Sequence, residues 1–224
     1  MLNTRPRLAS SEFLHYLAAQ SQASSSLPSL SDLSRELGIS VAALREQLEV
    51  ARAMGLVEVK PRTGVRRKPY SFTPAVRQSL QYALALDDQH FKQFTELRNH
   101  VETAYWEEAV GLLLVEDKSA LGILVDRAIH KLHGSPVQVP HEEHRLFHLL
   151  IYSRINNPFV TGILEAYWDA YEAVGLNIYT GGIDYLEEVW QYHNQMYQAI
   201  MSGDIQAGRQ ALIEHVDLLA HRPR

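Results

Sequence analysis

Residues 27–70, LPSLSDLSRELGISVAALREQLEVARAMGLVEVKPRTGVRRKPY, decide how this chain folds. Leucines at helical spacing predict a helix over residues 30–37, and a second apolar stripe predicts another over residues 41–53. Between them, Gly38 is free to take the left-handed conformation and Ser40 can cap the next helix. The stretch therefore predicts a helix-turn-helix, a motif whose second helix lies in the major groove of DNA.

A basic β-hairpin is predicted directly after the two helices. Two short strands flank the turn PRTG at residues 61–64, and four cationic side chains surround that turn. Cations on such a wing suit contact with phosphates or with the minor groove. The alternative is a generic helical pair followed by a solvated, charged hairpin. The candidate DNA-binding residues, taken from the caps, the second helix and the wing, are Ser29, Ser40, Arg45, Arg62, Gly64, Arg66, Arg67 and Lys68.

Charge is distributed unevenly along the chain. The net charge of the 224 residues is −5, which taken alone argues against nucleic acid as a partner. Residues 1–75 carry ten Lys or Arg and six Asp or Glu, a net of +4, whereas residues 76–224 carry eleven and twenty, a net of −9. Only the front of the chain is expected to meet phosphate. We therefore predict a winged helix-turn-helix domain over residues 1–72 and an all-helical domain over residues 73–224.

The composition is that of an ordinary globular protein, with 46% hydrophobic and 21% charged residues. No apolar run reaches the roughly 18 residues that cross a bilayer, and the start of the chain lacks the apolar block of a secretory signal. The absence of cysteine excludes disulfides, thiolate nucleophiles and Cys-based zinc sites. The expectation is a cytoplasmic protein that does not act at a membrane.

Four histidines fall on the apolar stripes of predicted helices in the second domain. That domain is expected to hold about seven helices, over approximately residues 75–86, 89–114, 118–133, 141–155, 159–176, 184–201 and 205–220. The inward-facing histidines are His144, His148, His193 and His215. The other histidines of this domain are expected to be solvated: His90, His100, His130, His133, His141 and His221.

The four inward histidines predict a metal site. A neutral imidazole buried without a partner costs roughly 1–3 kcal/mol, and one divalent ion would satisfy all four rings at once. Because His144 and His148 are four residues apart, a single helix would supply two ligands. Imidazole suits transition metals, and zinc or nickel are the first candidates. The alternative is four core histidines, each satisfied by a hydrogen bond.

An arginine also faces the predicted interior. Arg98 lies between Phe94 and Val101 on the inward face of its helix, and arginine is almost never buried unpaired. One interpretation is an i, i+4 salt bridge to Glu102. The other is a clamp for the carboxylate of a ligand, which the planar guanidinium matches with two hydrogen bonds. Arg98 and Glu102 are therefore the candidate effector-binding residues.

A spaced set of residues runs through the first domain: Leu27, Pro28, Ser29, Leu33, Leu37, Gly38, Ser40, Leu44, Arg45, Glu46, Leu48, Gly55, Leu56, Val57 and Gly64. With this set the domain resembles the winged helix of GntR-family transcription regulators. The resemblance implies a homodimer that binds a pseudo-palindromic DNA operator. Two positions depart from the family pattern, since Ser31 and Val41 stand where arginines commonly contact DNA. The operator sequence therefore stays open.

The second domain carries its own spaced pattern: Glu96-Leu97-Arg98, His144-Arg145-Leu146-Phe147-His148, Asn157-Pro158, His193 to Ala199-Ile200, and His215. With this pattern it resembles the FCD effector domain of FadR-type GntR regulators. The resemblance implies that an aspartate and three histidines hold a metal ion, and that an arginine over the metal receives a small organic acid. His144 replaces the aspartate, which makes the site less negative and favours softer metals over calcium or magnesium.

The expected function is a DNA-binding transcription regulator, not an enzyme, whose helical domain binds a metal ion and a small organic acid. One alternative is a helical metalloenzyme with the four histidines as its active site, although four protein ligands leave little room at a tetrahedral ion. The other is a GntR homologue with weakened DNA binding, because Ser31 and Val41 lack the expected charge.

Overall fold

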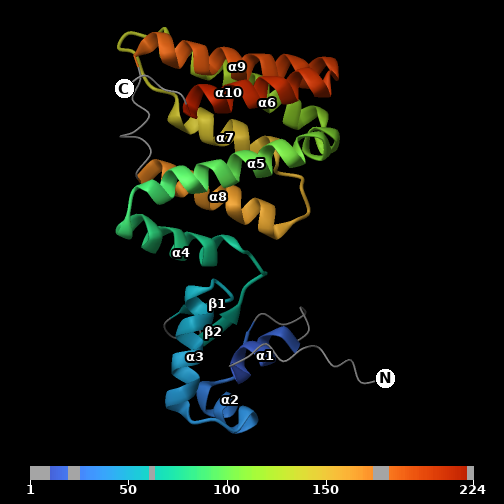
Figure 1. The fold of residues 1–224 in the computed structure, drawn as a ribbon. Helices are drawn as coiled ribbons and strands as arrows, with labels where there is room; N and C mark the ends of the chain where they lie inside the picture. The colour runs from blue at the N-terminus through green and yellow to red at the C-terminus, as the bar shows by residue number, and fades with distance from the viewer. Residues whose placement is uncertain (1–10, 20–25, 61–63, 174–181, 221–224) are drawn as a thin grey trace. The chain divides into compact units, whose positions relative to one another are not determined.

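The computed structural model describes residues 11–19, 26–60, 64–173 and 182–220 (Figure 1). The chain divides into two compact units, Met1–Gln78 and Ser79–Arg224. The predicted fold class, a winged helix-turn-helix followed by an all-helical domain, is confirmed. The functional boundary expected between residues 72 and 73 stays a prediction, because compactness alone does not show which residues contact DNA.

The first unit is built on a helix-turn-helix. It contains α1 (Glu12–Ala19), α2 (Leu30–Leu37) and α3 (Val41–Ala53). Ser29 caps α2 by accepting a hydrogen bond from the backbone N–H of Asp32, and Ser40 caps α3 in the same way. Gly38 follows α2 in the left-handed conformation, at a φ of 67°, which glycine adopts without strain. The predicted turn between the two helices is therefore present.

A two-stranded antiparallel sheet completes this unit, made of β1 (Val57–Lys60) and β2 (Gly64–Arg67). The register pairs Val57 with Arg67 and Lys60 with Gly64. This pairing turns Val57 and Val65 inward, so that the hairpin is tied to the helices through a shared core. The buried residues of that core are Phe13, Leu17, Leu33, Leu44, Leu48, Ala51, Val57 and Val65.

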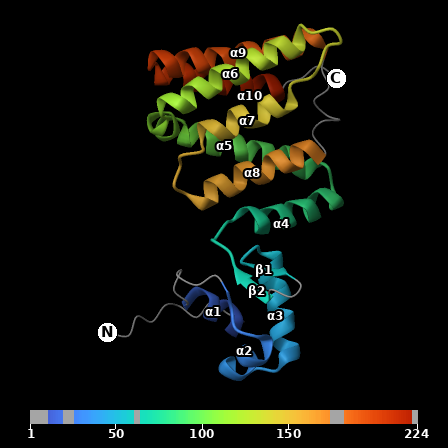
Figure 2. The ribbon, with the colours of Figure 1, turned by 180° about the vertical axis from the view of Figure 1, so that it is seen from behind.

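The second unit is helical throughout its described residues (Figure 2). After α4 (Thr73–Leu86), which begins in the first unit, its helices are α5 (Gln89–Leu112), α6 (Val115–Leu132), α7 (His141–Ile151), α8 (Pro158–Ala173), α9 (Ile183–Ser202) and α10 (Ile205–Ala220). In this unit α9 packs along α10 and against α6, α6 packs on α7, and α5 packs on both α8 and α10. None of the described helices is long and apolar enough to cross a bilayer.

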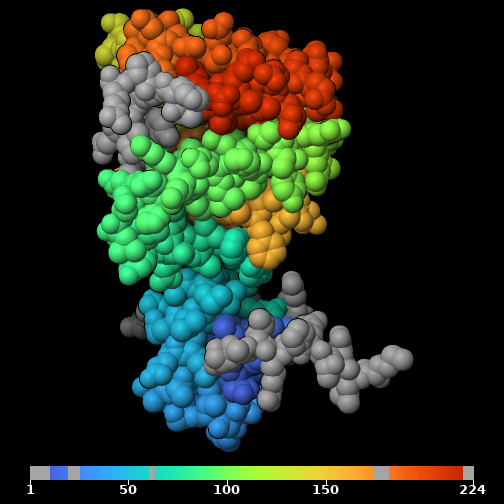
Figure 3. Space-filling view, viewed as in Figure 1, coloured from blue at the N-terminus to red at the C-terminus, as the bar shows by residue number. Residues whose placement is uncertain are grey.

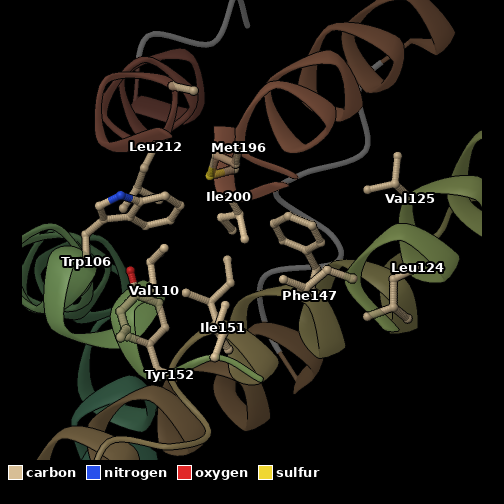
Figure 4. Packing of buried hydrophobic residues seen from close by; sticks show 14 of the residues in the cluster. Trp106, Val110, Leu124, Val125, Phe147, Ile151, Tyr152, Met196, Ile200 and Leu212 are labelled. Atoms are coloured by element: carbon tan, nitrogen blue, oxygen red, sulfur yellow. The ribbon is translucent and has the colours of Figure 1, made fainter. Parts of the chain in front are cut away.

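A large core of buried residues joins α5 through α10, and a smaller one joins α4, α5 and α8. Trp106 of α5, Ile151 of α7, Ile200 of α9 and Leu212 of α10 converge in the large core (Figure 4). Side chains of α5 and α10 also meet on the face shown in Figure 3. Their close approach depends on Gly208, since a Cβ there would lie 2.6 Å from the indole of Trp106. The large core thereby fixes α7, α9 and α10, the three helices that carry the four inward histidines.

The main departure from the predicted helix bounds is at the end of α7. A helix was expected over residues 141–155, and the prediction was wrong because α7 ends at Ile151. The cause lies in the next helix, since Pro158 begins α8 and Asn157 accepts a hydrogen bond from the backbone N–H of Phe159. Proline disfavours helical conformation in the residue before it, so the chain must leave the helix earlier.

Candidate metal centre and DNA-binding surface

The helix packing of the second unit brings the four predicted histidines together. His144 and His148 come from α7, His193 from α9 and His215 from α10. One nitrogen from each ring belongs to a set whose members all lie within 4.8 Å of one another. The ring centroids of His193 and His215 are 4.4 Å apart, and those of His144 and His193 are 4.7 Å apart. Residues separated by up to 71 positions in the sequence thus form a single cluster.

Hydrogen bonds orient two of these rings toward the centre of the cluster. Nδ1 of His193 lies 2.7 Å from the carbonyl oxygen of Val189, and Nδ1 of His148 lies 3.1 Å from Oε2 of Glu102. Both contacts leave Nε2 for the cluster, and the two Nε2 atoms are 3.1 Å apart. A histidine whose second nitrogen is held by a carbonyl or carboxylate is the usual arrangement of a metal ligand.

The other two rings lack partners. Nε2 of His144 and both nitrogens of His215 are buried without a hydrogen bond. His148, His193 and His215 are 0% exposed and His144 is 7% exposed, so bulk water does not reach the unpartnered nitrogens of His215 or Nε2 of His144. The alternative of four core histidines, each satisfied by a hydrogen bond, therefore does not describe this cluster. A bound cation would supply what these nitrogens lack.

Burial keeps the four rings uncharged, which is the state a metal ligand needs. Removal from water lowers the pKa of His193 to about 4, and it holds the pKa values of His144, His148 and His215 well below the ordinary 6.5. The neighbouring imidazoles and the charge of Arg98 push in the same direction for these three. The cluster is therefore neutral at physiological pH, with no proton to displace.

Arg98 and Glu102 lie on α5, beside the cluster, and both are fully buried. Nη2 of Arg98 is 2.9 Å from Oε1 of Glu102, close enough for an ion pair but without the alignment of a hydrogen bond. The guanidinium also lies 4.8 Å from the ring of Tyr167 and 5.3 Å from that of Trp168. Burial raises the pKa of Glu102 to about 7, although Arg98 acts to lower it.

Glu102 has a second contact that its sequence position does not reveal. It was expected only as the partner of Arg98 or as part of an effector site, whereas its other carboxylate oxygen meets His148. Arg98, Glu102 and His148 therefore form one chain of contacts that ends at the cluster. The available signal was weak: Glu102 follows Arg98 by one helical turn, but nothing in the sequence shows that α5 lies against α7.

Comparison with known families identifies the helical domain. The family model of the FCD domain matches residues 93–218, more than half of the chain. The chain belongs to the FCD domain family. All four clustered histidines, together with Arg98 and Glu102, lie within the matched segment. No curated protein has a sequence that matches this chain.

Solved structures share the fold over nearly the whole chain. Streptococcus agalactiae GntR aligns with a TM-score of 0.66 at 18% identity, over 92% of this chain and 94% of that one. E. coli McbR/YncC aligns with a TM-score of 0.50 at 19% identity, over 93% and 94%. Lar, which controls expression of the Listeria monocytogenes agr system, aligns with a TM-score of 0.50 at 16% identity, over 93% of each chain. The resemblance to FCD-bearing GntR regulators is confirmed, in the FCD domain's sequence and in the overall fold.

The FCD domain's four-histidine cluster passes a test of fit for a metal ion. Tetrahedral zinc binds nitrogen at about 2.0–2.1 Å, so its ligand atoms stand roughly 3.3 Å apart. The two Nε2 atoms of His148 and His193 stand at about that separation, at 3.1 Å, and the candidate ligand atoms of all four rings lie within 4.8 Å of one another. Glu102 supplies the outer carboxylate that such ligands commonly bind. His144, His148, His193 and His215 would hold the ion.

The candidate DNA-binding residues divide into structural and exposed groups. Ser29 and Ser40 are helix caps, and Gly64 takes a φ of 80° at the start of β2. Arg45, Arg66 and Lys68 are exposed, whereas Arg67 is half-buried and donates a hydrogen bond to the carbonyl oxygen of Leu17. Arg62 lies outside the described residues. Among the described candidates, the exposed basic side chains that could contact DNA are therefore those of Arg45, Arg66 and Lys68.

Two histidines expected to be solvated are partly buried. His90 lies with Nδ1 2.9 Å from the carbonyl oxygen of Ala83, and His141 lines a small cavity at the start of α7. Both residues lie in the first turn of a helix. There, neighbouring parts of the chain cover a side chain that helical periodicity predicts to be exposed. His100, His130 and His133 are exposed as predicted, and His221 lies outside the described residues.

The metal-free protein is expected to lose stability as the pH falls from 7 to 5. Histidines of the unfolded chain take up protons near pH 6.5, whereas the folded cluster stays neutral, to about pH 4 for His193. The stability that these rings contribute is therefore fully present above pH 6.5 and lost below it. The raised pKa of Glu102 has the opposite effect and adds stability as the pH falls, but it is a single group against four histidines. Thermal unfolding of chelator-treated protein at the two pH values measures the loss.

The variant His215→Leu provides the matched control. Leucine has a volume similar to that of histidine, but it does not titrate and it removes both of the unpartnered nitrogens of His215. We expect the metal-free variant to gain about 1–3 kcal/mol of stability over the parent at pH 7. It should also lose less on acidification. Equal acid losses in the two proteins would contradict the assignment of the loss to the cluster.

Proposed function

We propose that this protein is a metal-dependent transcription regulator that binds DNA as a homodimer. Its winged helix recognises a pseudo-palindromic operator, and its FCD domain holds a divalent transition metal, zinc or nickel, with a small organic acid as effector. The observation that carries this proposal is the convergence of four buried, neutral histidines within an FCD domain that follows a winged helix. We expect no catalysis, because catalytic zinc typically has three protein ligands and an open position.

The chemistry of the donor set supports zinc or nickel. Four neutral nitrogen ligands suit borderline transition metals, and the set lacks the carboxylate and carbonyl oxygens that calcium and magnesium require. When bound, the ion supplies a local positive charge that can attract and orient an anion. The histidines fix that charge between α7, α9 and α10, which ties three helices together at one point.

The charge of the loaded site supports an anionic effector. Four imidazoles bring no negative charge, and the carboxylate of Glu102, which contacts His148, is also paired with Arg98. A dication held there is left uncompensated, which is costly in a buried site. A small carboxylate would offset that charge. Nε of Arg98 is buried without a hydrogen-bond acceptor, so beside its ion pair with Glu102 the guanidinium has a donor left to bind such an anion.

The first unit supports DNA as the partner. Arg45 is exposed on α3, near the N-terminal end that faces bases in a helix-turn-helix. Arg66 and Lys68 are exposed on and after β2, where phosphate contact is expected of a wing. Since Ser31 and Val41 take the places of arginines in the family pattern, a larger share of affinity should come from the backbone contacts of the wing.

Arg45→Ala should weaken binding to the operator by about 1–3 kcal/mol, because a base contact would be lost. Arg66→Ala should instead lower affinity for every sequence and reduce the slope of log affinity against log salt by about one. Arg52→Ala is the control, since Arg52 is an exposed arginine of the same helix that pairs with Glu49. Fluorescence anisotropy with full-length protein measures all three variants. If the parent protein does not bind duplex DNA even at low salt, the regulator proposal fails.

Arg98→Lys should weaken effector binding while leaving metal content unchanged, because lysine keeps the charge but loses the two-pronged geometry. Arg98→Ala should weaken it further. A thermal-shift titration of metal-loaded protein with small mono-, di- and tricarboxylates measures binding, and elemental analysis measures the metal. Equal affinity in the parent and both variants would assign Arg98 to its bridge with Glu102 alone.

A further inference from the structure

A small cavity lies against the histidine cluster, between the start of α7 and helices α8 and α9. Its volume is about 20 Å³, enough for one water-sized group. His144 and His141 line it from α7, Tyr171 from α8, and Leu186 and Val189 from α9. The cavity therefore joins a candidate metal ligand to a side chain outside the cluster.

His144 is the one member of the cluster through which this cavity can reach the metal centre. His148, His193 and His215 are 0% exposed, whereas His144 is 7% exposed. Of the four histidines, His144 is the one that lines this cavity. A metal site inside a packed helical core needs a path by which the ion arrives. The geometry places that path at His144.

His141 stands at the outer part of the same path. It lies three residues before His144, so the two side chains occupy one face of α7 a single turn apart. Its ring is partly exposed and makes an edge contact with Tyr171 at 6.5 Å between centroids, as does the ring of His144 at 6.0 Å. Burial and the nearby charge of Lys131 lower the pKa of His141, which favours the neutral ring that a metal ligand needs.

Acidic side chains are exposed on the two helices that supply most of the cavity's lining: Glu142 on α7, and Asp184 and Glu188 on α9. The charge of Lys131, which would oppose a cation, is paired with Glu143 at 2.6 Å. Exposed negative charge raises the local concentration of cations and speeds their association.

We propose that His141 is the first residue to bind the incoming metal ion and that it passes the ion to His144 through this cavity. The inference rests on the proposed metal site. The ion exchanges one coordinated water for a nitrogen of His141; then the bond to His141 breaks as a bond to His144 forms. No electron is transferred, and both rings begin and end neutral. His141 is a transit ligand and does not belong to the final set of four.

The test separates the rate of metal uptake from the affinity at equilibrium. Metal-free parent and His141→Ala are mixed with Co²⁺ in a stopped-flow instrument, and the visible absorption of the bound ion is followed. We expect uptake to slow by about threefold or more in the variant, with unchanged final absorbance and unchanged affinity in a chelator competition. His130→Ala, which removes an exposed histidine of α6 that does not line this cavity, should match the parent.

A second variant keeps the test independent of the folding of His141→Ala. Leu186→Trp places a larger side chain in the cavity wall and leaves His141 intact, so uptake should slow there as well. Unchanged uptake rates in both variants would overturn the proposal while leaving the metal site standing. A loss of affinity through faster release, with normal uptake, would also overturn it, since it would make His141 a ligand of the final site. Absence of Co²⁺ binding by the parent would overturn the metal site itself.

Discussion

The FCD domain is organised around the cost of burying imidazole nitrogen without a partner. Each buried nitrogen has lost its hydrogen bonds to water, and only some of these nitrogens have a new partner in the protein. Nδ1 of His193 contacts the carbonyl oxygen of Val189, and Nδ1 of His148 contacts the carboxylate of Glu102. His215 keeps none and His144 lacks one at Nε2. A core made only for stability would place leucine or phenylalanine at these positions. Histidine at all four positions is what the proposed metal ion would require, and the contacts of His148 and His193 leave one nitrogen of each ring for it.

A chain of contacts behind the cluster orients the ring of His148. Glu102 holds His148 from behind, Arg98 holds Glu102, and the rings of Tyr167 and Trp168 cover the guanidinium. These contacts join α5 and α8 to the histidines on α7. An anion that binds Arg98 would compete with, or add to, its pairing with Glu102, and the orientation of His148 would respond. Such a ligand changes a second site only through its different affinity for two conformations.

Much of this arrangement could be predicted from the sequence, for reasons visible in single residues. Ser29, Gly38 and Ser40 act locally, so their cap and turn geometry follows from the residue type and its neighbours. The inward direction of the four histidines follows from helical periodicity alone. The contact of Glu102 with His148 could not be predicted in that way, because it depends on how α5 approaches α7. The early end of α7 and the half-buried position of His141 likewise depend on elements that follow in the chain or pack from outside it.

The central claim is that the four histidines exist to hold one metal ion, and its most direct test is the metal content of the purified protein together with its melting temperature. The account predicts about one equivalent of zinc or nickel per chain, and a melting temperature that chelator lowers and added metal restores. In His193→Ala the metal should be absent, and added metal should no longer raise the melting temperature. A parent protein that contains no metal, and whose melting temperature neither zinc nor nickel raises, would contradict the account.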